Sequence, residues 1–232
     1  MTTAARTVKL RRRALGADEI SAVMGILRRA APGWTVPAVT LIAEHYTDPF
    51  RVLIATVLSL RTQDETTADA SRRLFARATT PEAMLRLRAT TIAKLIYPVG
   101  FYRTKAASIL SICRDLVERW DGRVPRDLDD LLTLRGVGRK TANLVLTLGF
   151  RDQGICVDTH VHRITNRWGY VRTKAPDDTE MALRKKLPPE HWIEINDLLV
   201  AFGQQLCRPI SPHCSRCPID AYCPRRNVGT SR

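Results

Sequence analysis

The chain has 232 residues, 44% of them apolar, so it is long enough to bury a substantial core and too apolar for a disordered protein. It carries 37 Lys and Arg against 23 Asp and Glu, a formal net charge of +14. No apolar run approaches the roughly 20 residues that span a bilayer, and no apolar segment follows the basic first 15 residues, which argues against a membrane protein or a secreted one.

The excess of positive charge is typical of proteins that bind a polyanion, and nucleic acid is the partner it favours most. An ordinary soluble surface in an arginine-rich proteome would give the same balance. Residues 1–17 are predicted to form a disordered basic arm, and residues 225–232 a short basic tail. We expect an intracellular protein, located in the cytoplasm and nucleoid if the source is bacterial.

Apolar residues recur at helical spacing in short segments separated by proline, glycine or a capping residue. The segment ends at Gly122 and Gly169 are typical of helix C-termini. Strand alternation, tandem repeats and low-complexity segments are lacking, so the predicted fold class is all-α. In chain order, the predicted helices start at Asp18, Pro37, Asp48, Asp64, Thr80, Thr104, Asp127, Lys140, Asp158, Asp177 or Asp178, and Pro188.

Residues 134–143, Leu-Arg-Gly-Val-Gly-Arg-Lys-Thr-Ala-Asn, place two glycines one residue apart between two apolar helical segments. This pattern predicts two buried helices joined by a tight hairpin, whose backbone N–H groups point outward and can hold a phosphate. Lys140 lies in the first turn of the second helix, where the helix dipole disfavours the ammonium form. Lys140 is therefore either a nucleophilic amine or a lysine that only contacts phosphate.

Asp158 precedes another predicted helix, where an aspartate needs no role beyond capping. The helix from Lys140 to Gly149 rises about 15 Å, and residues 150–157 can return about 26 Å when extended. Asp158 can therefore lie beside Lys140. A carboxylate in that position could accept a proton from the lysine or stabilise developing positive charge, and this role is compatible with capping.

Four cysteines in the spacing C-x6-C-x2-C-x5-C occupy a short, proline-broken stretch: Cys207, Cys214, Cys217 and Cys223. A segment this small has little core of its own, so the pattern predicts one metal ion or cluster. Chemistry alone leaves zinc and a [4Fe–4S] cluster open, because zinc modules usually have two CxxC pairs and the spacing is not that of ferredoxins. Arg208, between the ligands, could contact phosphates. Cys113 and Cys156 are predicted to be buried thiols.

Together, residues 134–143, the segment Val157-Asp158-Thr159-His160 and the cysteine spacing resemble the endonuclease III family, helix-hairpin-helix DNA glycosylase/AP lyases that carry a [4Fe–4S] cluster. The resemblance extends from about residue 18 to residue 224. It implies that the lysine at Lys140 attacks C1′ of a damaged nucleotide, that Asp158 assists, and that the four cysteines hold the cluster. The resemblance also implies a six-helix domain, residues 42–152, inserted into an iron–sulfur domain made of residues 18–41 and 153–224.

The implied activity is that of a bifunctional glycosylase/AP lyase of base excision repair. Such an enzyme excises oxidised pyrimidines from duplex DNA through a lysine Schiff base and cleaves the strand by β-elimination. The expected partner is double-stranded DNA containing damaged bases or abasic sites, bound by a monomer across the cleft between the domains.

The expected DNA contacts come from the hairpin and from two loops that fill the gap left by the extruded nucleotide, Ser59–Asp64 and Gly100–Tyr102. Arg61 stands where many family members have glutamine and Gln63 follows two residues later, so either could contact the opposite strand. Phe101 stands where a leucine wedge is common, and it could insert between bases or be buried in the core. The full set of expected contacts is Gly136, Val137, Gly138, Arg139, Arg61, Gln63, Phe101 and Arg208.

Two other functions fit parts of the pattern. A monofunctional mismatch glycosylase would share the fold, but such enzymes generally lack the lysine found at Lys140. A non-catalytic DNA-binding or redox-sensing module would use the hairpin to hold phosphate and the cysteine loop to report oxidation.

Overall fold

The computed structural model describes residues 13–46 and 48–232, so most of the predicted basic arm lies outside the described residues. The described chain is helical and contains no strand, which confirms the all-α prediction. In chain order the α-helices are α1 (Ala17–Ala30), α2 (Ala38–Tyr46), α3 (Pro49–Ser59), α4 (Asp64–Phe75), α5 (Pro81–Leu85), α6 (Ala89–Ile96), α7 (Tyr102–Trp120), α8 (Leu128–Thr133), α9 (Arg139–Leu144), α10 (Thr159–Arg167), α11 (Pro176–Lys186) and α12 (Ile195–Gln205).

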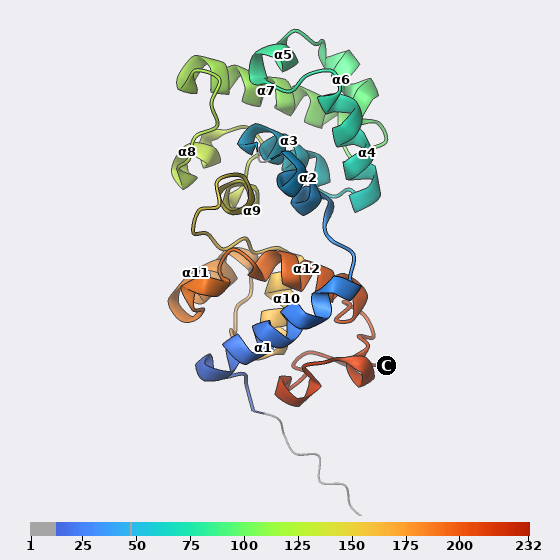
Figure 1. The fold of residues 1–232 in the computed structure, drawn as a ribbon, viewed down its shortest axis with the longest axis vertical. Helices are drawn as coiled ribbons and strands as arrows, with labels where there is room; N and C mark the ends of the chain where they lie inside the picture. The colour runs from blue at the N-terminus through green and yellow to red at the C-terminus, as the bar shows by residue number, and fades with distance from the viewer. Residues whose placement is uncertain (1–12, 47) are drawn as a thin grey trace, which may run out of the picture.

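The helices form two lobes stacked along the long axis (Figure 1). The upper lobe holds α2 to α9, and the lower lobe holds α1, α10, α11, α12 and the C-terminal segment. Each lobe has its own hydrophobic cluster, and the lower one combines α1 with residues 155–219. The predicted boundary at residues 41 and 42 falls inside α2, whose Val39 already belongs to the upper cluster. The lower lobe is therefore discontinuous in sequence.

Side-chain caps start several helices where the sequence predicts them. Asp48 accepts a hydrogen bond from the Phe50 N–H at 3.0 Å, and Thr80 accepts one from the Ala83 N–H at 3.2 Å. Asp127 accepts from the N–H groups of residues 129 and 130. These hydrogen bonds satisfy backbone donors that have no partner within their own helix.

Other predicted starts are wrong by a few residues. Asp18 and Asp64 lie inside the first turns of α1 and α4, whose N-caps are Gly16 and Gln63. An acidic side chain gains from the helix dipole anywhere in the first turn, so the residue type alone does not fix the start. Asp177 and Asp178 likewise follow Pro176, the first residue of α11.

Two more starts differ for backbone reasons. The helix predicted at Thr104 begins at Tyr102, directly after Phe101 takes a left-handed conformation with φ of 57°. The helix predicted at Pro188 is delayed to Ile195 by a 3-10 turn at Pro189–His191. The helix predicted over Lys140–Leu148 runs as α9 to Leu144 and continues as a wider π-helical turn, Val145–Gly149.

The lobes are joined by an ion-pair network beside α9. Glu180 on α11 is only 3% exposed and accepts hydrogen bonds from Arg139 at 3.0 and 2.8 Å and from Arg184 at 2.9 Å. Burial alone would raise the pKa of Glu180, but the hydrogen bonds from the two arginines outweigh burial and lower it. Arg184 also donates to the Asn143 side chain of α9 at 3.0 Å. The hairpin is thus held against the lower lobe.

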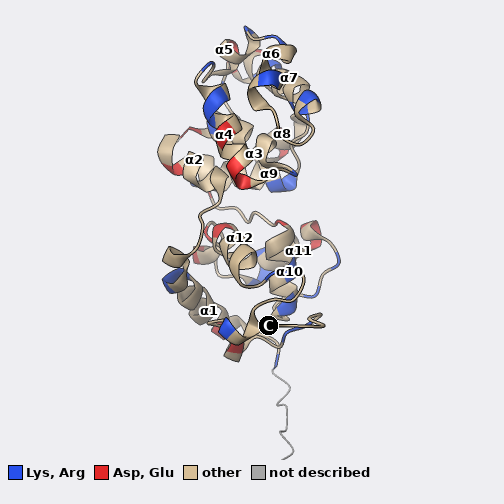
Figure 2. Ribbon diagram, turned by 90° about the vertical axis from the view of Figure 1, so that its right-hand side faces the viewer, with Lys and Arg blue, Asp and Glu red and all other residues tan. Residues whose placement is uncertain are grey.

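Lys and Arg residues lie on helices of both lobes (Figure 2). No helix in the described part of the chain combines the length and the apolar character needed to cross a membrane.

Candidate active site

The predicted hairpin connects α8 to α9. Leu134 and Val137 are buried and anchor it in the upper cluster, while Gly136 has a φ of +82°, a conformation that glycine adopts without strain. Gly138 caps α9, and a Cβ atom there would meet nothing within 4 Å. The protein therefore leaves open space outside Gly138, where a phosphate can approach the N–H groups at the start of α9.

Lys140 and Asp158 line the same pocket, of about 220 Å³, which spans both lobes. Lys140 lies in the first turn of α9 and is half-buried, and Asp158 is the N-cap of α10. The segment after Gly149 leads the chain back from the end of the π-helical turn to the start of α10, as its extended length allows. The structure therefore places the two predicted residues in one pocket.

Asp158 is held rigidly. It is 8% exposed, and its Oδ1 accepts hydrogen bonds from the His160 N–H at 2.8 Å and the Val161 N–H at 2.9 Å. Beneath Lys140, the Cys156 thiol donates to the Lys140 carbonyl oxygen at 3.6 Å, and burial raises the pKa of Cys156. Cys156 is therefore a neutral, buried thiol, as predicted.

The two predicted gap-filling loops lie side by side. The Gly100 N–H donates to Thr62 Oγ1 at 3.2 Å, and the Arg61 guanidinium lies 5.7 Å from the centre of the Phe101 ring. Phe101 is 62% exposed, so the alternative in which it is buried in the core is wrong. Gln63 is also exposed at the start of α4.

Lys105, which sequence reasoning missed, ties these loops together from below. Its side chain is 7% exposed, and Nζ donates to the carbonyl oxygens of Leu58 (2.8 Å) and Leu60 (2.5 Å) and to Thr62 Oγ1 (3.1 Å). Three acceptors match the three donors of an ammonium group. Burial lowers the pKa of Lys105 to about 8, which leaves it cationic at neutral pH. A sequence signal existed, because Lys105 lies four residues before Ile109 on the apolar stripe of α7.

Asp197 of α12 also lines the Lys140 pocket and was not predicted. It lies off the apolar stripe of its helix, which in sequence suggests a solvated residue. Thr40 of α2, from the other lobe, donates a hydrogen bond to Asp197 Oδ1 at 2.9 Å. Only the packing of the two lobes reveals this contact.

The remaining predicted DNA contacts are more scattered. Val137 is buried in the hairpin, and the guanidinium of Arg139 is paired with Glu180. Arg208 is exposed on the cysteine loop, and its Nε donates to the Gln204 carbonyl oxygen at 3.2 Å. Their roles toward DNA stay predictions.

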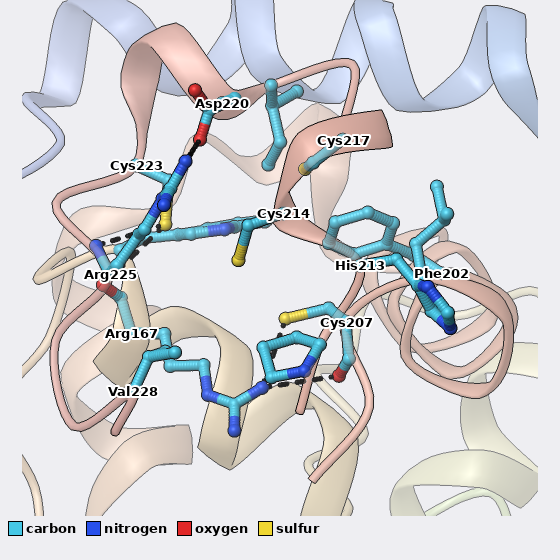
Figure 3. Close-up of a pocket in the computed structure, with 14 residues that line it drawn as sticks. Arg167, Phe202, Cys207, His213, Cys214, Cys217, Asp220, Cys223, Arg225 and Val228 are labelled. Carbon is cyan, nitrogen blue, oxygen red and sulfur yellow. Dashed lines mark hydrogen bonds and ion pairs between the residues drawn. The ribbon is translucent and has the colours of Figure 1, made fainter. Parts of the chain in front are cut away.

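The four predicted metal ligands surround one pocket in the lower lobe (Figure 3). Arg167 donates to the Cys207 sulfur at 3.3 Å, and the Arg225 N–H lies 3.4 Å from the Cys223 sulfur. Burial raises the pKa of Cys217 to about 12 and that of Cys223 to about 11, so these thiols need a metal cation to become thiolates at neutral pH. Within the described residues no three His, Cys, Asp or Glu side chains converge as one metal ion would require.

Comparison with known sequences places this chain among DNA repair proteins. Residues 54–189 match the HhH-GPD superfamily of base excision DNA repair proteins. Endonuclease III of Thermotoga maritima is 49% identical over 189 residues, which cover 80% of this chain and 89% of that protein. Endonuclease III-like protein 1 of Bos taurus is 43% identical, over 85% of this chain and 68% of that protein.

Solved structures give the same result. A non-covalent endonuclease III–DNA complex superposes with a TM-score of 0.80 at 33% identity and covers 90% of this chain and 95% of that one. A trapped endonuclease III–DNA covalent intermediate superposes with a TM-score of 0.79 at 32% identity, covering 90% of this chain and 96% of that one.

Proposed function

This chain belongs to the endonuclease III family of the HhH-GPD superfamily, so it is a DNA glycosylase with AP lyase activity in base excision repair, and we propose that the pocket of Lys140 and Asp158 is its active site. The observation that carries this proposal is that both residues, which come from different lobes, line one pocket. The substrate is duplex DNA that contains an oxidised pyrimidine or an abasic site.

The reaction requires that the damaged nucleotide leaves the base stack. The Lys140 amine then forms a bond to C1′ as the bond between C1′ and the base breaks, and the amine loses a proton. The sugar ring opens to give a Schiff base between Nζ and C1′. Loss of a proton from C2′ then breaks the bond from C3′ to its phosphate, which is the β-elimination that cleaves the strand.

Asp158 supports both halves of this chemistry. Its charge faces the position where positive charge develops on the sugar, and a fixed carboxylate stabilises such charge without reorganising. It can also accept the proton that Lys140 must lose. The two backbone N–H groups that bind Oδ1 fix the carboxylate for both roles.

The hairpin and the two loops hold the DNA around this pocket. N–H groups of residues 136–138 bind a phosphate near the extruded nucleotide. Exposed Phe101, with the Arg61 guanidinium beside its ring, fills the gap in the duplex together with either Arg61 or Gln63, both exposed on the neighbouring loop. Arg208 contacts the backbone from the cysteine loop.

A [4Fe–4S] cluster is the cofactor we infer for the four cysteines. All four donors are sulfur, they line one space, and Arg167 and Arg225 donate hydrogen bonds to two of them, which fits a cluster. Membership of the endonuclease III family favours the cluster over a single zinc ion. When bound, the cluster would link the four cysteines of residues 207–223 to one another and so hold this loop in a fixed shape. We also infer that the lobes correspond to the predicted domains and that the protein works inside the cell.

Borohydride trapping tests the function. Protein incubated with duplex carrying an abasic site or an oxidised pyrimidine should become cross-linked to the DNA, and Lys140→Gln should abolish the product. A monofunctional glycosylase would release the base without cross-linking, and a binding module would bind without doing either. Purified protein should contain four iron atoms per chain, whereas a colourless protein with zinc would overturn the cofactor assignment.

A further inference from the structure

Two charged groups of the pocket, Asp64 and Asp197, are not used by the reaction above. Asp64 accepts a hydrogen bond from the Gln204 side chain at 3.2 Å, and Asp197 lies on α12. It lines the pocket with Lys140 and Asp158, and its Oδ1 is fixed by the Thr40 hydroxyl at 2.9 Å. Within residues 13–46 and 48–232 no lysine, arginine or histidine forms an ion pair with it. Asp197 is thus a carboxylate held in place by one neutral hydrogen bond.

This arrangement is costly for the protein. Burial raises the pKa of Asp197 to about 6, and the charge of Glu44 adds to the rise, while the Thr40 hydrogen bond and the charge of Arg151 act in the opposite direction. Asp158 differs, because two backbone N–H groups stabilise its charge. Asp197 is half-buried, and a carboxylate with a raised pKa in a pocket is typical of a functional site. The alternative explanation is that Asp197, in the first turn of α12, only complements the helix dipole.

The pocket around Asp197 has the chemistry of a nucleobase site. Its walls combine apolar side chains, which suit the faces of a planar base, with polar side chains, which suit its edge. Asn196, next to Asp197, donates a hydrogen bond from its side-chain amide to the Cys156 carbonyl oxygen at 3.3 Å. The apolar set is Pro37, Val39, Leu144 and Val200, and the polar set includes Thr40, Asn196, Asp197 and Gln204.

A base attached to the C1′ atom that Lys140 attacks must occupy this same pocket. An extruded base is read by hydrogen bonds to its Watson–Crick edge. A carboxylate accepts hydrogen bonds and donates none, so it selects an edge with an N–H group. Thymine- and uracil-derived lesions offer N3–H there, and cytosine-derived lesions offer the exocyclic amine.

We propose that Asp197, oriented by Thr40, recognises the damaged pyrimidine by accepting a hydrogen bond from an N–H on its Watson–Crick edge. The assignment rests on the proposed function of the pocket. It makes Asp197 a specificity-determining residue, distinct from Lys140 and Asp158, and it gives base recognition to the lower lobe.

The test compares wild-type protein and Asp197→Asn on three duplexes, which carry 5,6-dihydrothymine, its N3-methyl derivative or an abasic site. Single-turnover base release is measured on the first two and borohydride cross-linking on the third. The ratio of dihydrothymine release to abasic-site cross-linking should fall roughly 10- to 100-fold in Asp197→Asn, as expected when a charged hydrogen-bond acceptor is lost. The N3-methyl base, which has no N3–H, should show little further loss. Thr40→Val should lower the same ratio by a smaller factor.

The matched control is Asp178→Asn, which makes the same change on an exposed residue in the first turn of α11, outside the pocket. Equal losses on the abasic and base-containing duplexes would assign Asp197 to the chemistry or the fold and overturn the proposal. An unchanged ratio would show that Asp197 only complements the dipole of α12. An equal loss on the N3-methyl base would show that Asp197 does not act through a hydrogen bond from N3–H. If wild-type protein never cross-links to abasic DNA, the proposed function itself fails, whatever Asp197 does.

Discussion

The Asp158 side chain has a structural role, as the N-cap of α10, and a proposed chemical role in the reaction. A single substitution can separate the two roles. Its capping bonds need only an oxygen acceptor, which asparagine also supplies, whereas the proposed support of positive charge needs the carboxylate. The same substitution therefore distinguishes the roles.

Asp158→Asn should keep stability within about 0.5 kcal/mol, since asparagine is as good an N-cap as aspartate, and should slow imine formation by a factor on the order of 100. Asp158→Ala should lose both, with unfolding easier by about 1–2 kcal/mol. Urea denaturation and borohydride trapping measure the two effects. A large stability loss in the asparagine variant would show that the charge itself holds α10.

Replacing Asp197 should raise the stability of the protein at neutral pH while it lowers base release. Its pKa rises from 3.8 to about 6 on folding, so the folded state resists ionisation of this group. The resulting cost is absent below about pH 4, grows between pH 4 and 6, and is complete above pH 6, where it amounts to about 2–3 kcal/mol. Asp197→Asn should therefore stabilise the protein at pH 7.5 and lose most of that advantage at pH 4.5.

Thermal unfolding of Asp197→Asn at both pH values provides the measurement. Asp178→Asn, on an exposed residue in the first turn of α11, should shift stability by less than about 0.5 kcal/mol at either pH. A stabilisation of the same size at both pH values would mean that packing, and not the charge, is responsible.

At the scale of elements, the loop Ser59–Asp64 depends on α7. Gly100 approaches this loop so closely that a Cβ atom there would lie 2.6 Å from the Arg61 carbonyl oxygen, and Lys105 ties the loop to α7 through three hydrogen bonds. The exposed side chains that should enter the duplex are thus carried on backbone that is fixed from inside.

Lys105→Met should loosen that backbone. Two carbonyl groups would lose their donor, at a cost of about 1–3 kcal/mol that is partly offset by removal of a buried charge. Hydrogen exchange of the amides at residues 59–64 and 100–102 should accelerate, and excision of a paired lesion should slow more than cleavage at an abasic site. Lys94→Met, which changes an exposed lysine of α6, should alter neither. Unchanged exchange at residues 59–64 would show that other contacts hold the loop.

The sequence predicts elements well where the signal is local. Asp48, Thr80, Asp127 and Asp158 begin helices as expected, because a cap acts on N–H groups two or three residues away. The pairing of Lys140 with Asp158 was also predictable from the reach of the intervening chain. The position of Lys105 on the apolar stripe of α7 could have indicated its burial, but its hydrogen-bond acceptors lie more than 40 residues away and could not be predicted. The contact of Asp197 with Thr40 was not predictable either, because the two residues are more than 150 residues apart and only tertiary packing brings them together.

At the scale of the whole molecule, the lobes must keep a fixed relation for one pocket to contain residues of both. Glu180 provides this by binding Arg139 of the upper lobe and Arg184 of its own helix. The lowered pKa of Glu180 means that these bonds stabilise the fold above its ordinary value of 4.5 and are lost as the pH falls below it.

Glu180→Gln should therefore destabilise the protein by about 1–3 kcal/mol at pH 7, and the difference from wild type should shrink as the pH falls toward 4. Cross-linking to abasic DNA should slow as well, because α9 carries Lys140. Thermal unfolding across this pH range and the trapping assay are the measurements. Glu190→Gln, on an exposed residue of the same lobe, is the control. A penalty that does not depend on pH would contradict the ionic account.

The discontinuous lower lobe also sets the order in which a nascent chain can become native. The apolar face of α1, formed by Ile20, Val23, Met24 and Leu27, is completely covered in the finished protein, but its partners on α12 are synthesised about 170 residues later. At roughly 5–20 residues per second, that face waits on the order of 10–30 s on the ribosome. The upper lobe, which is contiguous, can fold during this interval. Among the described helices, α1 is therefore made early and buried late, and its apolar face is open to aggregation and to chaperones during synthesis.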